Sequence, residues 1–371
     1  HLTILSLEPV VSCSNYKFND LNNTCQVKIE FDHIATKERF ESYEIISKKL
    51  TPTGGGFMGI LYEIDLKGET TEGAKELNIF VKNIPENEQM KIYSVSDEEC
   101  NKKSIILEHL GKRGFRVYNR METVTLDYAK LCIQELAKFH ALSMVLKEKK
   151  PEHFNNKIAT MKQPFNFEED WNGFVRNMYN YSINCLEPDV KEKVEQKILE
   201  KVNDYPKYMN DISGVCTLCH GDYKLNNIMN HFFQEGELKE VITIDFQISH
   251  YGCPILDFLY FIFNGTDQEF RNNHLSDLKD LYCEAMDTFL KYFGLDIEKI
   301  FPRAEFERVY KEKLDFGLMI NVFYIPFLFA AEDDAPDVAN ETLSTLSFNV
   351  DNRFTERFRG IVDDFIKWGY L

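Results

Sequence analysis

Between residues 44 and 66, strand-like patterns of apolar and polar residues lie on both sides of a glycine-rich turn. A β-like run over residues 44–50 is followed by a turn-rich segment, residues 51–59, with three consecutive glycines, Gly54, Gly55 and Gly56. Beyond the turn, apolar residues occupy every second position, at Ile60, Tyr62, Ile64 and Leu66. Alternation of period two is typical of a half-buried strand. The pattern therefore predicts a strand, a glycine loop and a second strand.

The strand-like pattern continues after this loop. Residues 77–82 form a third apolar run that ends on a lysine, and residues 90–95 and 104–110 fit a further hairpin. Residues 1–40 mix short apolar runs with Asn and Ser and show no clean period, so we treat them as an N-terminal extension. The sequence thus predicts an extension and a β-rich lobe within residues 1–110.

After residue 110 the apolar spacing becomes that of helices. Within residues 126–147, one helical face carries Leu126, Ala129, Ile133, Leu136, Ala137 and His140. Further helical patterns cover about residues 166–182 and 188–210, and several more lie between residue 256 and the C-terminus. A β-rich island at residues 216–245 interrupts them. We predict a mainly helical second lobe over residues 111–371, and hence an α+β fold.

Composition limits the partners of this chain. Its 371 residues, 44% hydrophobic and 28% charged, suit a globular protein of two lobes. A formal net charge of −17 opposes the phosphate backbone of nucleic acid. No apolar run approaches the length of a membrane span, and no signal segment opens the chain. We expect a cytoplasmic protein that binds neither nucleic acid nor membranes, and its oligomeric state cannot be read from the sequence.

The cysteines do not form a recognisable metal or disulfide pattern. There are nine, an odd number without regular spacing, and Cys216 and Cys219 lack the second CxxC pair that a tetrahedral zinc site needs. We interpret them as reduced thiols.

Two segments of the β-rich island carry oxygen ligands in a pattern that suits phosphoryl transfer. In the first, Asn227 follows Asp222 by five positions, and in the second a short apolar run, residues 241–244, ends on Asp245. Transfer from ATP needs a carboxylate that orients or deprotonates the attacking hydroxyl, and oxygen ligands that hold magnesium on the phosphates. We predict Asp222 as the catalytic base and Asn227 and Asp245 as magnesium ligands. An Asp at a strand end is by itself more often a turn former or a helix cap, so the prediction rests on both segments together.

His220 precedes this base by two positions. We predict a structural role for it, in which its ring fixes the loop through backbone hydrogen bonds, over a catalytic role.

These motifs resemble the ecdysteroid kinase-like, or CHK kinase-like, branch of the choline and aminoglycoside kinase group. The resemblance extends from about residue 50 to residue 263 and more loosely to the end. It is carried by His-Gly-Asp-x-x-x-Asn-Asn-x-Met at 220–229, Ile-Asp-Phe-Gln at 244–247, Gly-Cys-Pro-Ile-Leu-Asp-Phe-Leu-Tyr-Phe at 252–261, Leu-Glu-His-Leu at 107–110 and Glu-Leu-Ala-Lys-Phe-His-Ala at 135–141.

The resemblance implies a two-lobed protein-kinase-like fold that binds ATP between a β-rich N-lobe and a helical C-lobe, which also holds the acceptor. Lys82 would contact the α- and β-phosphates, and Gly54, Gly55 and Gly56 would cover them. Without the resemblance, a solvated lysine and a plain hairpin turn explain these residues equally well. The connector between the lobes would be Glu108, His109 and Leu110, which offer backbone groups to adenine, and Asp257 would brace the catalytic loop.

One feature departs from the kinase pattern. A kinase N-lobe carries a helix after the lysine strand, and a glutamate of that helix pairs with the lysine. Only 25 residues separate Lys82 from Glu108, too few for that helix together with a strand pair and its connections. Either the protein lacks the helix, or residues are missing from the sequence near residues 83–92. We favour the second interpretation, which predicts a break in the chain there.

Several functions remain open at this level. The preferred one is an ATP- and magnesium-dependent kinase that phosphorylates an ecdysteroid or a similarly apolar alcohol. A choline or ethanolamine kinase would need an acidic and aromatic cage for the amine. A pseudokinase would bind nucleotide without turnover, and a protein kinase is disfavoured because no Ala-Pro-Glu segment follows Asp245. Candidate walls of an acceptor pocket are four aromatic residues, Phe258, Phe261, Tyr324 and Phe327.

Overall fold

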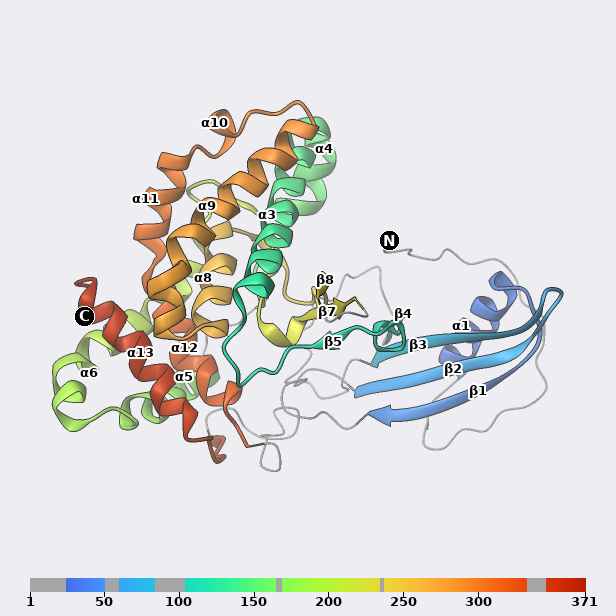
Figure 1. Ribbon diagram of the computed structural model, residues 1–371, viewed down its shortest axis with the longest axis horizontal. Coiled ribbons are helices and arrows are strands. Elements are labelled where there is room, and N and C mark those ends of the chain that lie inside the picture. Colours follow the sequence, from blue (N-terminus) through green and yellow to red (C-terminus); the bar gives the residue numbers. More distant parts are fainter. Residues whose placement is uncertain (1–24, 51–59, 84–103, 165–168, 234–236, 332–344) are drawn as a thin grey trace. The chain divides into compact units, whose positions relative to one another are not determined.

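The computed structural model of the protein describes residues 25–50, 60–83, 104–164, 169–233, 237–331 and 345–371. The described residues fall into two units. The first ends at Gly114, and the second begins at Phe115 and continues to Leu371. Figure 1 shows strands in the first unit and mainly helices in the second. The predicted α+β fold, with a β-rich N-terminal and a mainly helical C-terminal part, is confirmed.

The first unit is an antiparallel sheet with one helix against it. Its strands lie in the order β1-β2-β3-β4. The elements are α1 (Cys25–Lys37), β1 (Phe40–Leu50), β2 (Ile60–Thr70), β3 (Gly73–Asn83), β4 (Ser104–Glu108) and the short 3-10 helix η1 (Leu110–Arg113). Alternate residues of the strands face the helix and share one buried cluster with it: Phe31, Ala35, Ile45, Tyr62, Ile64, Leu66, Ile79 and Val81. Residues from Cys25 onward are therefore part of this unit and not merely an extension of it.

Helices dominate the second unit. They are α3 (Leu126–Lys149), α4 (Pro151–His153), the π-helical η2 (Phe154–Ile158), α5 (Glu169–Asn184), α6 (Pro188–Asn203), α7 (Tyr205–Met209), α8 (Pro254–Gly265), α9 (Gln268–Tyr292), α10 (Ile297–Ile300), α11 (Arg303–Lys313), α12 (Asp315–Leu328) and α13 (Arg353–Lys367). Every residue of α8 is buried, and nearly every residue of α12 is. A helix that is apolar on all sides belongs in a core, so these two form the centre of the unit.

Two small sheets lie beside the helices of the second unit. One contains β5 (Arg116–Val117), β7 (Ile228–Phe232) and β8 (Leu238–Thr243), and the other pairs β6 (Thr217–Cys219) with β9 (His250–Gly252). The 3-10 helix η3 (Leu225–Asn227) joins the two sheets. These elements confirm the predicted β-rich island between helices.

Most strand and helix predictions are confirmed, and one is wrong. The helix predicted over residues 188–210 is two helices, α6 and α7, which are separated at Asp204. Pro206 lies in the first turn of α7, where its missing N–H costs nothing, but inside a longer helix it would remove a hydrogen bond. Residues 84–103 lie outside the described residues. The chain break expected in place of the kinase helix, and part of a predicted hairpin, fall in this range.

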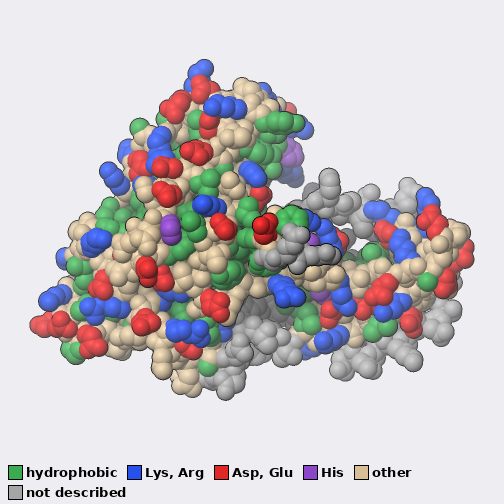
Figure 2. Space-filling model, in the orientation of Figure 1, with side chains coloured by type: hydrophobic (Ala, Val, Ile, Leu, Met, Phe, Trp, Pro, Cys, Tyr) green, Lys and Arg blue, Asp and Glu red, His purple; other side chains and the backbone are tan. Residues whose placement is uncertain are grey.

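The surface and the thiols agree with the composition. Figure 2 shows acidic and basic side chains interspersed over the described part of this face, so the acidic excess does not gather into one patch there. Among the described residues, no helix is both long and apolar enough to cross a membrane. The described cysteines are free thiols: Cys132, Cys185, Cys216, Cys219, Cys253 and Cys283.

The contact between α8 and α12 requires a glycine, which gives a test of the core. A Cβ atom on Gly317 would lie 2.3 Å from Cδ2 of Phe263, whose side chain is fully buried. We expect Gly317→Ala to lower the free energy of unfolding by about 1–3 kcal/mol, because the ring has no room to move. Urea denaturation measures this. Gly214→Ala is the control, since a Cβ atom there meets nothing within 4 Å, and an equal effect in both variants would contradict the packing argument.

Candidate functional site

A tight turn after β6 begins the predicted catalytic loop, which carries Asp222 and Asn227. Pairing of Cys219 with His250 ends the strand, and Gly221 then adopts a left-handed backbone with φ of 82°. A Cβ atom on Gly221 would lie 2.5 Å from the carbonyl oxygen of Ile248. Glycine is needed here both for the backbone conformation and for the close approach of the two segments.

The carboxylate of Asp257 fixes this turn from the first turn of α8. Its Oδ2 accepts a hydrogen bond from the backbone N–H of His220 at 2.6 Å, and its Oδ1 accepts one from the N–H of Gly221 at 2.9 Å. A third bond, at 3.1 Å, comes from Nε2 of His140 on α3. Burial favours the neutral acid, but these donors outweigh it and hold the pKa of Asp257 below its ordinary value. The predicted bracing role of Asp257 is confirmed.

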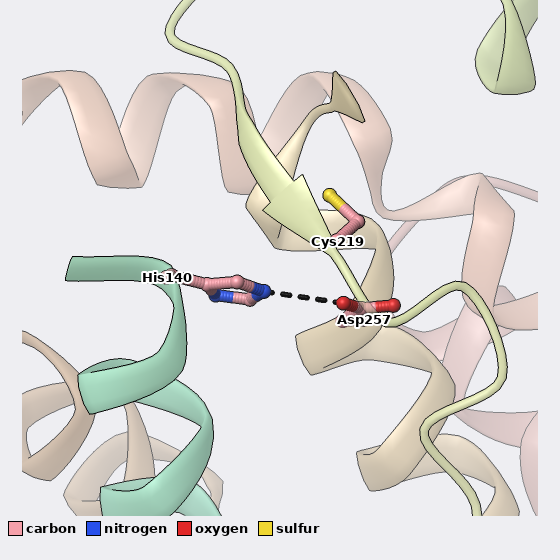
Figure 3. Close-up of side chains that lie close together, drawn as sticks. All are labelled: His140, Cys219 and Asp257. Atoms are coloured by element: carbon pink, nitrogen blue, oxygen red, sulfur yellow. Dashed lines mark hydrogen bonds and ion pairs between the residues drawn. The ribbon is translucent and has the colours of Figure 1, made fainter. Parts of the chain in front are cut away.

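Figure 3 shows His140, Cys219 and Asp257 close together, with ligand atoms within 4.8 Å of one another. This cluster does not suit a metal ion, because both oxygens of Asp257 already accept hydrogen bonds from N–H groups. Burial also raises the pKa of the Cys219 thiol well above its ordinary value, which disfavours the thiolate that a metal requires. We assign the cluster to the bracing of the loop.

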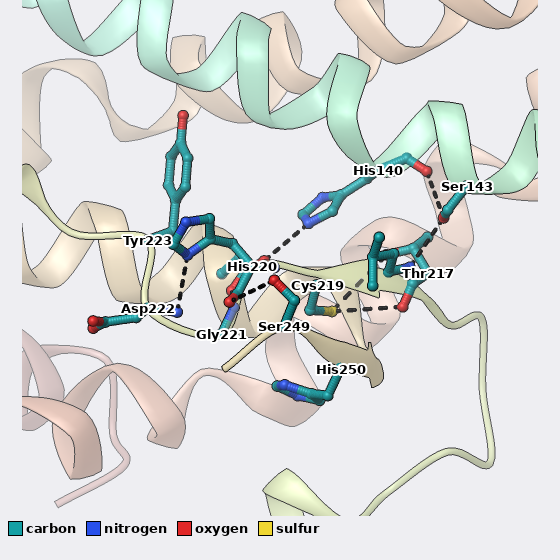
Figure 4. Close-up of polar contacts among 12 residues, drawn as sticks. His140, Ser143, Thr217, Cys219, His220, Gly221, Asp222, Tyr223, Ser249 and His250 are labelled. Carbon is teal, nitrogen blue, oxygen red and sulfur yellow. Dashed lines mark hydrogen bonds and ion pairs between the residues drawn. The ribbon is translucent and has the colours of Figure 1, made fainter. Parts of the chain in front are cut away.

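The His220 ring links the loop to the segment that carries Asp245. Its Nδ1 accepts a hydrogen bond from the N–H of Asp222, as Figure 4 shows. Its Nε2 donates to the carbonyl oxygen of Ile244 at 2.9 Å. These two bonds assign the donor role to Nε2 and the acceptor role to Nδ1. On the other side, the N–H of Ile244 donates to the carbonyl oxygen of Asn227 at 2.8 Å. The predicted structural role of His220 is confirmed, since it fixes Ile244, the residue before Asp245.

Asp222 carries a buried carboxylate with three donors around it. The residue is 7% exposed. Its Oδ2 accepts from Nδ2 of Asn227 at 2.9 Å and lies 2.8 Å from Nζ of Lys224. Its Oδ1 accepts from the hydroxyl of Tyr260 on α8 at 2.8 Å. Asp222 and Asn227, which are both predicted site residues, are therefore in direct contact.

The protonation state of Asp222 follows from this environment. Burial opposes ionisation, but the charge and hydrogen bond of Lys224, together with the bond from Tyr260, lower the pKa of Asp222 below its ordinary value. The same pairing outweighs the burial of Lys224 and raises the pKa of its ammonium group. Asp222 and Lys224 thus form a buried ion pair in which both groups are charged at neutral pH.

Asp245 has a backbone conformation that is uncommon for residues other than glycine. Its φ is 65°, in the left-handed region that a non-glycine residue enters at a cost. It follows the end of β8 and lies near enough to Lys224 for its charge to raise the pKa of that lysine. The second unit therefore brings Asp222, Asn227 and Asp245 into one neighbourhood.

Two oxygen donors in this neighbourhood fit a magnesium ion. Both hydrogen bonds that Nδ2 of Asn227 donates go to Asp222, and the carbonyl Oδ1 of Asn227 has no donor among the described residues. The half-buried carboxylate of Asp245 supplies the second oxygen group. Carboxylate and amide oxygens are the ligand types that Mg²⁺ prefers.

Helix α3 supports the loop and the adjoining strands at several points. The hydroxyl of Tyr223 donates to the carbonyl oxygen of Cys132 at 2.8 Å, and Oγ of Ser143 accepts from the N–H of Leu218 at 3.0 Å. The hydroxyl of Tyr128 donates to the carbonyl oxygen of Ile228 at 3.2 Å. These bonds satisfy buried backbone groups on both sides of the loop.

The remaining predicted residues belong to the first unit. Lys82 lies on β3, a central strand, between Leu61 of β2 and Ile105 of β4. Glu108 ends β4, and Leu110 begins η1. Between them, the N–H of His109 donates to the carbonyl oxygen of Asn78, so this N–H is not available to adenine. The roles of Lys82, Glu108, His109 and Leu110 toward ATP stay predictions, and Gly54, Gly55 and Gly56 lie outside the described residues.

Sequence reasoning missed two residues that contact Asp222. Lys224 lies between the base and Asn227, but nothing in the motif indicates that its ammonium group turns back onto the carboxylate. Tyr260 follows Asp257 by three positions on α8, a spacing that places both side chains on the face toward the loop. That spacing could have identified it.

Two of the four predicted pocket walls are wrong. Phe258 and Phe261 are fully buried, with no surface open to water or to a ligand. Phe258 packs against Tyr282, Phe306 and Tyr310 in the helical core. Phe327 is nearly buried, and Tyr324 is half-buried beside Lys224.

Comparison with known protein families finds one that matches this chain. Residues 90–295, more than half of the chain, match the model of the ecdysteroid kinase-like family. No curated protein matches the chain. The match confirms the resemblance that the motifs indicated.

Two solved structures show only distant similarity. Choline kinase LicA from Streptococcus pneumoniae is 14% identical over 81% of this chain and 98% of its own length, with a TM-score of 0.33. A choline/ethanolamine kinase family protein from Mesorhizobium loti is 12% identical over 76% of this chain and 77% of its own, with a TM-score of 0.34. Similarity at this level carries no information about the reaction of this chain.

The bracing role of Asp257 can be tested by removing one acceptor. In Asp257→Asn the amide nitrogen cannot accept a hydrogen bond, so a buried N–H of His220 or Gly221 loses its partner. We expect the free energy of unfolding to fall by about 1–3 kcal/mol. Chemical denaturation measures this. Asp277→Asn, on the exposed side of α9, is the control and should have no effect. Equal stability of the two variants would contradict the bracing role.

The ion pair of Asp222 and Lys224 predicts a pH effect. In the native protein the lowered pKa of Asp222 keeps it ionised down to acidic pH. Lys224→Met removes the charge that lowers this pKa, whereas the burial that raises it remains, so the acid limb of activity against pH should move to higher pH.

The measurement is kcat/KM against pH for each protein, with the substrates of the proposed reaction. Lys130→Met, which changes an exposed lysine of α3, serves as the matched control. An unshifted acid limb in Lys224→Met would show that Lys224 does not set the ionisation of Asp222.

Proposed function

The chain belongs to the ecdysteroid kinase-like family, and on that premise we propose that it transfers the γ-phosphoryl group of ATP to a hydroxyl group of a small alcohol. Family membership supports a small-molecule kinase in general terms. The observation that carries the finer proposal is the carboxylate of Asp222, which is buried, ionised and held by Asn227, Lys224 and Tyr260.

Asp222 is suited to orient an acceptor hydroxyl. Its Oδ1 accepts a hydrogen bond from Tyr260, and a carboxylate oxygen has a second lone pair for the acceptor O–H. A carboxylate with a lowered pKa is a weak base. Phosphoryl transfer passes through a loose transition state that needs positioning more than early proton removal. Asp222 would therefore align the hydroxyl first and take its proton late in the transfer.

The metal ligands of this proposal are Asn227 and Asp245. Oδ1 of Asn227 and the carboxylate of Asp245 would hold magnesium, which when bound neutralises charge on the phosphates. The backbone bonds of Ile244 to His220 and Asn227 keep the two ligands on neighbouring segments. Lys82 would contribute a further positive charge to the α- and β-phosphates, as the resemblance implies.

The acceptor that we propose is an ecdysteroid or a similarly apolar alcohol. Supporting it are aromatic residues on two helices of the second unit. Phe174 of α5 is half-buried, and its ring packs on the buried rings of Phe323 and Phe327 of α12, with centroid distances of 6.2 and 5.9 Å. On the same helix, the ring of Tyr324 lies 5.8 Å from that of Tyr260, which donates to the base. Aromatic side chains provide large apolar contact area for a flat, apolar ligand.

Separate substitution of the two carboxylates tests the assigned roles. Asp222→Asn should retain ATP affinity while turnover falls by about 10²- to 10⁴-fold, the usual scale of general-base contributions. Asp245→Asn should weaken magnesium-dependent ATP binding as well as turnover, because the metal acts in both the ground state and the transition state. The measurements are calorimetric ATP affinity, with and without magnesium, and ADP release with an ecdysteroid as acceptor.

Asp277→Asn again provides the control for a change of one surface charge. Equal loss of nucleotide affinity in Asp222→Asn and Asp245→Asn would mean that the two roles are assigned wrongly. Magnesium-dependent ATP binding with no turnover on sterols, amino alcohols or aminoglycosides would favour a pseudokinase instead.

A further inference from the structure

Lys224 places a positive charge directly beside the proposed base. The residue is 9% exposed, and its Nζ lies 2.8 Å from Oδ2 of Asp222. The same Nζ lies 4.6 Å from the centre of the Tyr324 ring. The ammonium group is thus held by a carboxylate and an aromatic face at once, which is the combination that binds organic cations.

Among the described residues, this arrangement occupies the carboxylate and the aromatic face that a cationic acceptor would need. A choline or ethanolamine molecule has only two carbon atoms between its hydroxyl and its nitrogen, so a hydroxyl at Asp222 keeps the positive nitrogen close to the same carboxylate. Among the described residues, the aromatic rings near Asp222 include those of Tyr260, Tyr324 and Tyr205, and the ring of Tyr205 is buried and stacks on Phe316. The ring of Tyr324 already faces Lys224, and Tyr260 is buried and uses its hydroxyl on Asp222.

We propose that Lys224 is a specificity-determining residue that makes the site select an uncharged alcohol and reject cationic amino alcohols. This inference rests on the proposed kinase function and narrows its acceptor class. The ammonium of Lys224 neutralises Asp222 and repels a second cation at short range. An uncharged alcohol can approach the free lone pair of Asp222 without displacing Lys224 from either partner.

The local charges also disfavour an anionic acceptor. Besides Lys224, the charged groups among the described residues near Tyr324 include the carboxylates of Asp222 and Asp245 and the guanidinium of Arg120, which donates hydrogen bonds to three backbone carbonyl oxygens within residues 327–330. The negative charge of Asp222 is balanced by Lys224. Asp245 is a proposed ligand of a magnesium ion that would also bind the nucleotide phosphates. Lys224 and Arg120 both already contact protein groups, so neither of these two cations is left for an acidic acceptor.

A pair of probes with the same shape and different charge tests the inference. Choline and 3,3-dimethylbutan-1-ol differ mainly in a positive nitrogen that replaces a carbon. Their dissociation constants would be measured by ligand-observed NMR on the full chain, with and without magnesium and a non-hydrolysable ATP analogue. We expect the native protein to bind the uncharged alcohol at least about tenfold more tightly, a ratio equivalent to one cation–π contact.

Variants at Lys224 separate charge from shape. Lys224→Met should reduce the preference by about tenfold or reverse it, because Asp222 and the ring of Tyr324 become available to choline. Lys224→Arg keeps the charge and should keep the preference, and Lys130→Met should behave as the native protein does.

Tighter or equal binding of choline by the native protein overturns the inference, as does the absence of binding of both probes. An unchanged preference in Lys224→Met also overturns it. Phosphoryl transfer to ecdysteroids and other alcohols is followed separately by ADP release. If no acceptor is phosphorylated while the binding preference is present and depends on Lys224, the proposed kinase function fails and the selectivity of the site stands.

Discussion

The buried carboxylate of Asp257 is the interaction on which the rest of the site depends. Two successive backbone N–H groups, those of His220 and Gly221, point to the same side at the turn after β6 and need acceptors away from water. Asp257 supplies both acceptors, and His140 adds a third hydrogen bond from α3. Because the turn is fixed in this way, the carboxylate of Asp222 is directed toward Tyr260 and Asn227.

The residues that hold the loop in place and the residues proposed to bind ligands form two separate sets. The two sets lie on the same short segments of the chain. His220 and Asp257 use all their polar atoms on protein partners, so they position other groups. Oδ1 of Asp222 accepts one hydrogen bond, and Oδ1 of Asn227 has no donor among the described residues, so these two oxygen atoms keep capacity for a ligand. Ile244 connects the sets, since His220 and Asn227 bind its two backbone groups and thereby place Asp245.

The sequence predicts the parts of this site that are close together along the chain. Asp222 and Asn227 lie within one loop and one short helix, and the hairpin of β7 and β8 returns the chain to Asp245, so local pattern was sufficient. The contact of Lys224 with Tyr324 joins residues 100 positions apart, so no repeating pattern in the sequence could predict it. Helix α1 was missed for a related reason, since only the packing of Phe31 and Ala35 on the sheet reveals its apolar face.

Helix α3 touches the site at Tyr128, Cys132, His140 and Ser143. These contacts spread over about 22 Å at the rise of an α-helix. A loop that is hydrogen-bonded to one helix at several points along its axis cannot unfold locally by itself, because each hydrogen bond helps to hold the groups of the next in place. Exchange of the loop amides with solvent deuterium should therefore occur only when α3 separates from the small sheets, and the loop should share the opening free energy of the helical unit instead of behaving as surface loops do.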